Sequence, residues 1–450
     1  MKAIWTSLLA VAVAMTASDA SAQKAAEPAH WITTWTASPM NTQPSDSVWL
    51  GFYDQTVREV ARLSVGGDRL RLRLSNEFGS VPVVIDSIHV ALAGEGGAIQ
   101  PETDRGVTFG GKRAVTLAPG APAFSDPIDF EVAPLSHVAV SMYFKDRAAI
   151  QSYHYEAQQT AYVSSGGDFT GKESMPVEQK FTSHYFLSGI MVEGAAGARV
   201  VVAFGDSITD GFRSTIDGDR RFPDDLAERL QKTPGFEHVA VVNQGIGGNR
   251  VLHDGRGAKA LARFDRDVLS VPNVSHVIFL EGINDIGWPD SPIASADEAV
   301  TAEQLFDAYR QLVERAHLRG IKVIGATLMP FEDTFAGVSL HAFYNPEKEK
   351  VRVAVNDWIR SSNVFDGVID FDAVTRDPQH PSRIRAEYDG GDHLHPNDLG
   401  YKAMAEDLVR KSGHRRPPRR GRGYAGARCR MRSGSQGTAA ASGILRRAPR

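Results

Sequence analysis

The stretch Arg199–Gly211, with the sequence R-V-V-V-A-F-G-D-S-I-T-D-G, decides the fold. Residues Val200–Phe204 are apolar and mostly β-branched, which is typical of a strand buried on both faces of a sheet. The segment Gly205–Ser207 then ends the strand, and a helix-like stretch follows. A serine at this junction lies at the carboxyl edge of a parallel sheet, where open α/β sheets bind ligands. The pattern fits either a reactive serine or a turn in which Ser207 caps the next helix.

Strand-like and helix-like segments alternate from residue 198 onward. The expected strands are Val200–Phe204, His238–Val242, His276–Leu280, Lys322–Leu328 and Gly367–Phe371. The expected helices are Asp224–Gln231, Lys259–Val268, Ala302–Arg319, Pro346–Ile359 and Leu399–Arg410. This alternation predicts a parallel sheet with helices on both faces. We place the α/β domain at residues 198–411, after the small-residue linker Gly194–Ala198.

Three further polar blocks accompany the predicted strands. The second strand leads into Asn243–Arg250 (N-Q-G-I-G-G-N-R), and the third leads into Glu281–Asp285 (E-G-I-N-D). The block Asp392–Asn397 (D-H-L-H-P-N) lies near the end of the domain. Because the carboxyl ends of parallel strands share one edge of a sheet, we expect these blocks to converge on one crevice.

The residue types in these blocks suit nucleophilic catalysis. A serine hydroxyl such as that of Ser207 is a poor nucleophile until a base takes its proton, and His395 can be that base. Asp392, three residues earlier, could hold the imidazole in the required tautomer. An oxyanion needs preorganised donors. The backbone N–H groups of Ser207 and Gly248 and the side-chain amide of Asn284 could supply them.

Neighbouring residues could fill some of these roles instead. The competing candidates are Gly245 and Gly247 for Gly248, His393 for His395, and Asp389 for Asp392. The glycine-rich block is not a phosphate loop, because the lysine that this motif requires does not follow it.

Other residues of the blocks are expected to support the site. Asp206 and Asp285 are predicted to brace the loops through backbone hydrogen bonds. Arg250 and Trp288 are candidates for contacts with the substrate. Together with Trp288, the loop Phe331–Phe343 is expected to wall the pocket.

The four blocks, in this order over residues 200–410, resemble the SGNH (GDSL-type) hydrolases. The resemblance implies a flavodoxin-like three-layer α/β/α sandwich and ester hydrolysis through an acyl-serine intermediate, with no metal or organic cofactor. It implies that Ser207 is the nucleophile and that Asp392 and His395 form the acid–base pair. It also implies an oxyanion hole of Ser207, Gly248 and Asn284.

The N-terminal half has the period of β-strands. Residues Arg69–Leu74 alternate strictly between arginine and leucine, and further strand-like runs follow at Val81–Leu92, Ala114–Leu117, Ile128–Val132 and Val138–Phe144. Short strands separated by Gly- and Pro-containing turns predict an antiparallel, sandwich-like all-β domain, which we place at residues 23–194. It resembles the β-rich domain that precedes the catalytic domain of some exported family members.

Aromatic and histidine side chains of this half carry no evident catalytic cluster. The aromatic residues either pack the seam between the domains or form a platform for sugar rings. They are Trp31, Trp35, Trp49, Tyr153, Tyr155, Phe181, Tyr185 and Phe186. The histidines lack the spacing of metal ligands and are expected to be structural or at the surface. They are His89, His137, His154 and His184.

The first 22 residues have the pattern of a signal peptide. Lys2 precedes the apolar run Ser7–Met15, and Ala20–Ala22 is a small-residue cleavage site, so we expect the mature chain to begin at Gln23. The protein is therefore predicted to be periplasmic or secreted, and no later segment is long and apolar enough to span a membrane. The single cysteine, Cys429, allows no internal disulfide.

Charge is distributed unevenly along the chain. Residues 411–450 contain twelve of the 50 Lys and Arg residues and no Asp or Glu, which leaves 38 basic and 54 acidic residues and a formal charge of −16 for the rest. An acidic body excludes nucleic acid as an expected partner. The tail at 412–450 is basic and aperiodic, so we expect it to be disordered. We also expect that it is not a selected part of the fold and arises from a change of reading frame after Ser412.

The sequence thus predicts a serine esterase that acts on small-molecule or glycan esters. Short acyl groups, including acetyl groups, are the substrates we expect it to prefer. Alternatives within the same chemistry are a lysophospholipase, a thioesterase or an acyltransferase. An alternative of another class is an inactive carbohydrate-binding protein.

Overall fold

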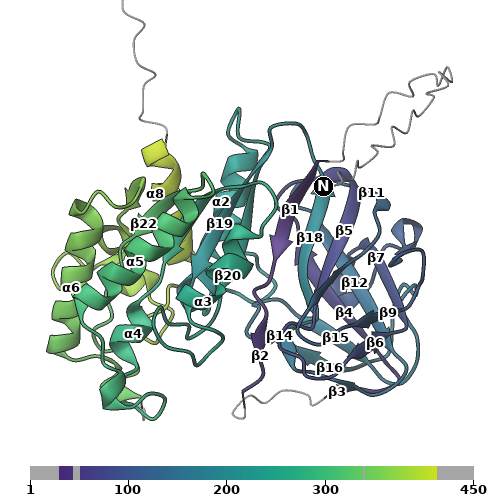
Figure 1. Cartoon of the computed structure of the whole chain (residues 1–450), viewed down its shortest axis with the longest axis horizontal. Helices are drawn as coiled ribbons and strands as arrows, with labels where there is room; N and C mark the ends of the chain where they lie inside the picture. Colours follow the sequence, from purple (N-terminus) through teal and green to yellow (C-terminus); the bar gives the residue numbers. More distant parts are fainter. Residues whose placement is uncertain (1–29, 44–50, 338–339, 413–450) are drawn as a thin grey trace, which may run out of the picture.

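The computed structural model describes residues 30–43, 51–337 and 340–412, and these form two parts of different architecture (Figure 1). The β-rich part contains the strands from Trp31 to Glu193, and the α/β part begins with the strand Arg199–Gly205. The predicted signal peptide, Trp49, Cys429 and the basic tail after Ser412 lie outside the described residues.

The β-rich part consists mainly of two antiparallel sheets. The first contains, in spatial order, β1 (Trp31–Thr36), β18 (Leu187–Glu193), β5 (Gly67–Ser75) and β10 (Pro122–Phe124), with β11 (Ile128–Val132) also paired to β5. The second contains β16 (Val177–Phe181), β15 (Ala161–Ser164), β4 (Gln55–Arg62), β12 (His137–Phe144), β7 (Ser87–Leu92) and β8 (Arg105–Gly106). Shorter strands are β2 (Met40–Asn41), β3 (Gly51–Phe52), β6 (Val83–Ile85), β9 (Val115–Leu117), β13 (Ala148–Ala149), β14 (Ser152–His154) and β17 (His184–Tyr185).

The alternation of strand β5 behaves as the sequence predicts. Leu70, Leu72 and Leu74 are fully buried, whereas the arginines between them are partly exposed. The predicted run Val81–Leu92, however, is not one strand. Asp86 breaks it into β6, which pairs with β9, and β7, which pairs with β12. The Asp86 carboxylate accepts a hydrogen bond from the backbone N–H of Lys145, which stabilises the break.

The α/β part is built on one parallel sheet. Its strands are β20 (Val239–Gly245), β19 (Arg199–Gly205), β21 (Val274–Leu280), β22 (Lys322–Ala326) and β23 (Gly367–Ile369), in that spatial order. The second strand in the chain lies outside the first, which is the 2-1-3-4-5 order of flavodoxin-like folds. The predicted flavodoxin-like domain behind a β-rich domain is therefore confirmed.

Helices flank this sheet in two groups (Figure 1). α2 (Phe222–Gln231) packs against α8 (Asp398–Ser412), and α5 (Ala302–His317) packs against α6 (Pro346–Ser361) and α3 (Ala260–Phe264). Among the described residues, every helix is too short or too polar to cross a lipid bilayer.

The helices differ in detail from those expected. The predicted helix Lys259–Val268 is α3 followed by a π-helical turn at Asp265–Leu269. The helix-like stretch expected after Gly205–Ser207 is the short helix α1 (Ser207–Asp210). Two other short helices follow strands and were not expected, because one turn of helix shows no periodicity. They are α4 (Ile283–Gly287) and α7 (Phe371–Thr375).

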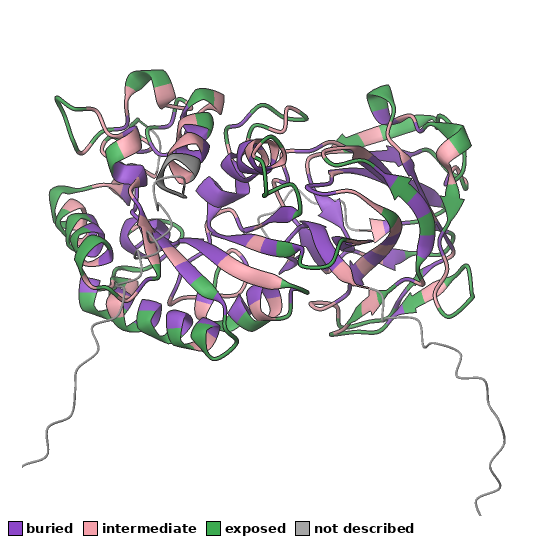
Figure 2. Cartoon of the chain, turned by 90° about the horizontal axis from the view of Figure 1, so that it is seen from above, coloured by how far each residue is buried: buried purple, intermediate pink, exposed green. Residues whose placement is uncertain are grey.

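The two parts share a continuous core. Strand β1 lies beside β20 (Figure 1). The buried apolar side chains of both parts form one cluster, and Figure 2 shows the buried residues of both parts in purple. Polar side chains of the β-rich part also bond across this contact, which we call the seam. Thr36 Oγ1 donates to the carbonyl oxygen of Asn243 at 2.6 Å, and the backbone N–H of Val241 donates to Ser64 Oγ at 2.8 Å.

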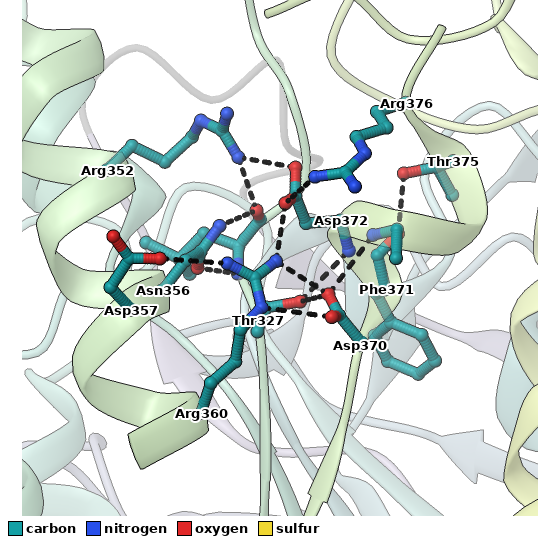
Figure 3. Close-up of polar contacts among 12 residues, drawn as sticks. Thr327, Arg352, Asn356, Asp357, Arg360, Asp370, Phe371, Asp372, Thr375 and Arg376 are labelled. Carbon is teal, nitrogen blue, oxygen red and sulfur yellow. Dashed lines mark hydrogen bonds and ion pairs between the residues drawn. The ribbon is translucent and has the colours of Figure 1, made fainter. Parts of the chain in front are cut away.

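The carboxyl ends of β22 and β23 are held by an ionic network (Figure 3). Arg360 of α6 bonds to both Asp370 and Asp372, and Arg352 donates to Asp372 Oδ1 at 2.9 Å. Thr327 Oγ1 donates to Asp370 Oδ1 at 2.9 Å. Burial alone would raise the pKa of Asp370, but the hydrogen bonds from Arg360, the backbone N–H of Ala373 and Thr327 together lower that pKa to about 2. These two strand ends are therefore structural, which leaves the ends of β19, β20 and β21 for a site.

Candidate active site

Ser207 lies at the point where strand order reverses in the sheet. It is the first residue of α1 and follows β19, which lies between β20 and β21. Asp206 caps the helix, since its Oδ1 accepts a hydrogen bond from the backbone N–H of Ile208 at 2.9 Å. A Cβ on Gly205 would lie 2.4 Å from the carbonyl oxygen of Leu280. Glycine is thus needed before Ser207, and the turn places the serine in the crevice where open α/β sheets bind ligands.

Ser207 begins a chain of hydrogen bonds that runs through His395 to Asp392. The distance from Ser207 Oγ to His395 Nε2 is 2.7 Å, and that from His395 Nδ1 to Asp392 Oδ2 is 2.9 Å. A carboxylate accepts only, so the proton lies on Nδ1 and Nε2 accepts the hydroxyl proton of Ser207. All three residues are buried, with 4–6% of their surface exposed.

The loop that carries His395 is shaped by Asp392. Oδ1 of Asp392 accepts from the backbone N–H groups of Leu394 and His395, at 3.2 and 2.9 Å. Oδ2 also accepts from Arg213 Nε at 3.0 Å. Although burial alone would raise the pKa of Asp392, the bonds from His395 and Arg213 hold that pKa well below its usual range. Asp392 is therefore an anion wherever the protein is folded near neutral pH.

The alternative pair in this block lies elsewhere. His393 Nδ1 contacts Asp389 Oδ2 at 2.5 Å, and the His393 side chain is half exposed. Ser207 contacts His395, so the structure separates the two histidines that the sequence left in competition.

Gly248 and Asn284 come together beside this chain. A backbone hydrogen bond from Asn249 to Ile246 closes a turn in which Gly248 has φ of +73°, a conformation that favours glycine. Asn284 Nδ2 donates to the carbonyl oxygen of Asn249 at 2.9 Å. Because an amide nitrogen carries two N–H bonds, this contact leaves one for a ligand.

Gly245, one of the two competing glycines, has a packing role. A Cβ there would lie 2.2 Å from the backbone nitrogen of Asp210. The assignment of Gly248 as an oxyanion donor stays a prediction.

The two bracing aspartates are confirmed. Asp206 caps α1, as described above. Asp285 Oδ2 accepts from the backbone N–H of Val251 at 2.7 Å, and its Oδ1 accepts from that of Leu252 at 2.9 Å. Asp285 thereby ties the Asn284 helix to the segment after Gly248. Burial raises the pKa of Asp285 to about 6.

Sequence reasoning missed Arg263, which lies fully buried beneath the site. Its Nη2 donates to the carbonyl oxygen of Gly205 at 2.8 Å and to Glu281 Oε1 at 3.1 Å. Its Nη1 donates to the carbonyl oxygen of Gln244 at 2.8 Å. One guanidinium thus joins the ends of β19, β20 and β21. Burial nevertheless raises the pKa of Glu281 well above its usual value. The only available signal was an arginine within the predicted helix Lys259–Val268.

Arg250 and Trp288 are engaged within the protein. Arg250 Nη1 forms an ion pair with Glu298 at 2.7 Å. The Trp288 ring is stacked on Phe335 with centroids 6.1 Å apart and meets the edge of Phe343 at 4.7 Å. Their predicted contact with substrate stays a prediction.

The α/β part has the flavodoxin-like α/β/α architecture, with Ser207, His395 and Asp392 at the carboxyl edge of its sheet. Residues 201–408 match the GDSL-like lipase/acylhydrolase family, and this part of the chain belongs to it. Ester hydrolysis is therefore the activity of the family to which the domain belongs. Among curated proteins, none matches the chain.

Several solved structures are similar to the chain over about half of its length. An α/β hydrolase from a metagenome of Lake Arreo, Spain, is 22% identical, and the match covers 49% of this chain and 96% of that one with a TM-score of 0.37. A GDSL-like lipase from Bacteroides thetaiotaomicron is 18% identical, with coverage of 47% and 87% and a TM-score of 0.33. A carbohydrate acetylesterase from Sinorhizobium meliloti is 16% identical, with coverage of 48% and 98% and a TM-score of 0.36.

Proposed function

We propose that this protein is a serine esterase that hydrolyses short acyl esters through an acyl-serine intermediate. Acetyl esters of carbohydrates are the substrates that we propose it prefers. The observation that carries the proposal is the 2.7 Å hydrogen bond between Ser207 Oγ and His395 Nε2, with Asp392 on the opposite ring nitrogen. This arrangement meets the geometric requirement for a nucleophile, a base and a group that orients the base.

In the first half of the reaction, His395 Nε2 takes the hydroxyl proton while Ser207 Oγ bonds to the ester carbonyl carbon. The backbone N–H groups of Ser207 and Gly248 and the free N–H of Asn284 stabilise the oxyanion. When the intermediate collapses, the bond to the alkoxide breaks and the alkoxide takes the proton from His395. The products are an alcohol and acyl-Ser207. The Asp392 carboxylate stabilises the imidazolium that exists between these proton transfers.

In the second half, a water molecule gives a proton to His395 as its oxygen attacks the acyl carbon. The same donors hold the second oxyanion. Collapse breaks the bond from carbon to Ser207 Oγ, which recovers its proton from His395, and the carboxylic acid leaves. Every proton lost by Ser207 or water thus passes through one imidazole.

The preference for a small acyl group is supported by the packing next to Asn284. Trp288 follows Asn284 by four residues, and its backbone N–H donates to the Asn284 carbonyl oxygen. The Trp288 ring packs with Phe335 and with Phe343, which is fully buried. The backbone N–H of Phe335 donates to the carbonyl oxygen of Asp392 at 3.2 Å, so the segment that carries Phe335 contacts the loop of His395.

We also propose that the protein is exported, on the basis of the pattern around Ser7–Met15 and Ala20–Ala22. N-terminal sequencing of the protein from the cell envelope or medium should give Gln23 as the first residue. Retention of Met1 in a cytosolic product would contradict this.

A panel of 4-nitrophenyl esters of rising chain length, with acetylated xylan as a second substrate, tests the proposed activity. We expect the largest kcat/KM for acetate or butyrate, together with release of acetate from the polysaccharide. An optimum at long acyl chains, or no release of acetate, would contradict the proposed substrate class.

A further inference from the structure

The segment Tyr155–Thr160 of the β-rich part reaches the glycine loop of the α/β part. Glu156 Oε2 lies 3.1 Å from the position that a Cβ on Gly247 would occupy. The guanidinium of Arg256 lies over the Tyr155 ring, 4.8 Å from its centroid. The Arg256 side chain in turn lies 3.0 Å from the corresponding position at Gly248. The two domains therefore meet beside the predicted oxyanion donor as well as at the seam.

This segment is fixed by residues of both parts. The backbone N–H of Ala157 donates to the carbonyl oxygen of Thr182 at 2.7 Å, within the β-rich part. The backbone N–H of Asp217, in the α/β part, donates to the carbonyl oxygen of Gln158 at 3.0 Å. Glu156 and Gln158 have φ of +57° and +53°, which is unfavourable for residues with a Cβ. Such strain persists where the surroundings impose it, often at ligand sites.

A cavity of about 320 Å³ opens on the β-rich side of this segment, and we call it the sandwich cavity. Its lining combines aromatic rings with polar groups. The rings of Phe181 and Tyr185 meet edge to face with centroids 5.9 Å apart. The lining residues that matter here are Tyr155, Phe181, Tyr185, Thr160, Thr182 and the exposed Lys180. The Lys180 ammonium lies over the Tyr162 ring, 5.4 Å from its centroid.

We propose that the sandwich cavity binds a sugar ring of the alcohol half of the ester, an inference that rests on the proposed esterase function. Aromatic faces suit the C–H face of a sugar, while hydroxyls and an ammonium group suit its hydroxyl edge. The volume lies at the lower end of the range for ligand pockets, which fits one ring.

The position of the cavity explains how it could act on the reaction. Tyr155 belongs both to its lining and to the contact with Arg256, which packs on Gly248. A glycan held there lies on the β-rich side of the oxyanion loop, so its ester carbonyl can extend toward Ser207. The β-rich part thus selects the alcohol, and the α/β part performs the chemistry.

The test compares Phe181→Ala and Lys180→Ala with the unmodified full chain on two acetates. One is an acetylated xylo-oligosaccharide, and the other is 4-nitrophenyl acetate, whose alcohol is a single aryl ring without hydroxyls. We expect Phe181→Ala to raise KM for the oligosaccharide about tenfold with little change in kcat, because loss of one stacking ring corresponds to about one factor of ten. The ratio of kcat/KM between the sugar and aryl esters should fall by the same factor.

Phe124→Ala is the matched control, because Phe124 is an exposed aromatic residue on β10 of the same domain. It should leave the ratio unchanged. Lys180→Ala provides a second test that does not depend on the folding of the Phe181 variant, because Lys180 is exposed. This variant should also lower the ratio of kcat/KM between the sugar and aryl esters.

Equal loss on both esters, or no change in the ratio, would overturn the proposal for the cavity while leaving the esterase intact. If the unmodified protein hydrolysed neither ester, the proposed function would fail. Calorimetric binding of deacetylated xylo-oligosaccharide to Ser207→Ala, with and without Phe181→Ala, then decides the cavity alone. Binding that depends on Phe181 supports the proposal, and absent or unaffected binding overturns it.

Discussion

Two buried histidines in this protein each contact an aspartate, one in the crevice and one between the two parts of the chain. His395 Nδ1 lies 2.9 Å from Asp392 Oδ2, and His154 Nε2 lies 3.0 Å from Asp210 Oδ1. The members of the first pair are three residues apart in the sequence, and those of the second are 56 apart. Geometry and burial alone do not distinguish the two pairs.

The second ring nitrogen makes the difference. His395 Nε2 faces the Ser207 hydroxyl, which can give it a proton, whereas His154 Nδ1 faces the carbonyl oxygen of Ser38 at 2.9 Å. Both partners of His154 are acceptors, so its ring donates from both nitrogens and is an imidazolium cation. A buried His–Asp pair is thus equipped for chemistry only where its remaining nitrogen can accept a proton. At the seam the same pair is a structural ion pair.

The largest expected difference is between His395→Gln and His154→Gln. We expect His395→Gln to lower kcat by a factor on the order of 10⁶, because the nucleophile loses its base. His154→Gln should keep most of the activity and lose stability instead. Steady-state kinetics and chemical denaturation of both variants provide the measurement. Comparable activity of the two variants would show that His395 has no special role.

Removal of the Asn284 amide should have the next largest effect. Asn284→Ala removes one proposed oxyanion donor, so kcat should fall by about 10²–10³ with little change in KM. Ser214→Ala is a suitable control, because the buried Ser214 hydroxyl makes no hydrogen bond within the described part of the chain. A change in KM alone would instead assign Asn284 to ground-state binding.

The smallest effect concerns the pH dependence of stability. Burial alone would lower the pKa of His154, but the charge of Asp210 raises this pKa above its usual value of 6.5. The stabilisation is therefore complete below pH 6.5 and is lost as the pH rises through the folded-state pKa. His154→Gln should cost about 1–3 kcal/mol at pH 6 and remove this dependence.

Urea denaturation from pH 6 to pH 9 measures that dependence. Arg221 is the other charged group that acts on His154, and its positive charge lowers the pKa of His154. The neighbouring His184 is neutral, because burial lowers its pKa well below 6.5. His317→Gln is the control, since it breaks an exposed pair with Asp366 that should contribute less than about 1 kcal/mol. Equal pH profiles for the unmodified chain and His154→Gln would show that His154 is neutral.

Much of the α/β part could be predicted from the sequence because its information is local. Each strand is a short apolar run, and the polar blocks of Ser207, Gly248 and Asn284 each follow a strand at the edge where parallel strands converge. The block Asp392–Asn397 is recognisable by the spacing of its aspartate and histidine. Ser207, His395 and Asp392 could be singled out for this reason, and the structure brings them together. His395 was favoured over His393 on spacing, and only His395 contacts Ser207.

The remaining features depend on partners far apart in the sequence. Arg263 has the position of an ordinary helix residue until the three strand ends that it joins are assembled. His154 gains its charge from two partners distant in the sequence, Asp210 in the other domain and the carbonyl oxygen of Ser38. Tyr155 contacts Arg256, whose side chain packs on the Gly248 turn. Contacts between distant residues leave no periodic pattern in the local sequence. The sequence analysis therefore assigned these residues either no role or only a general structural role.

Labelling the protein with a fluorophosphonate and mapping the adduct by peptide mass spectrometry tests the central claim most directly. We expect one adduct, on Ser207, formed at a rate that falls sharply in His395→Gln and is unchanged in Ser214→Ala. An adduct on another residue, or labelling of Ser207 that does not depend on His395, would contradict the account of this site.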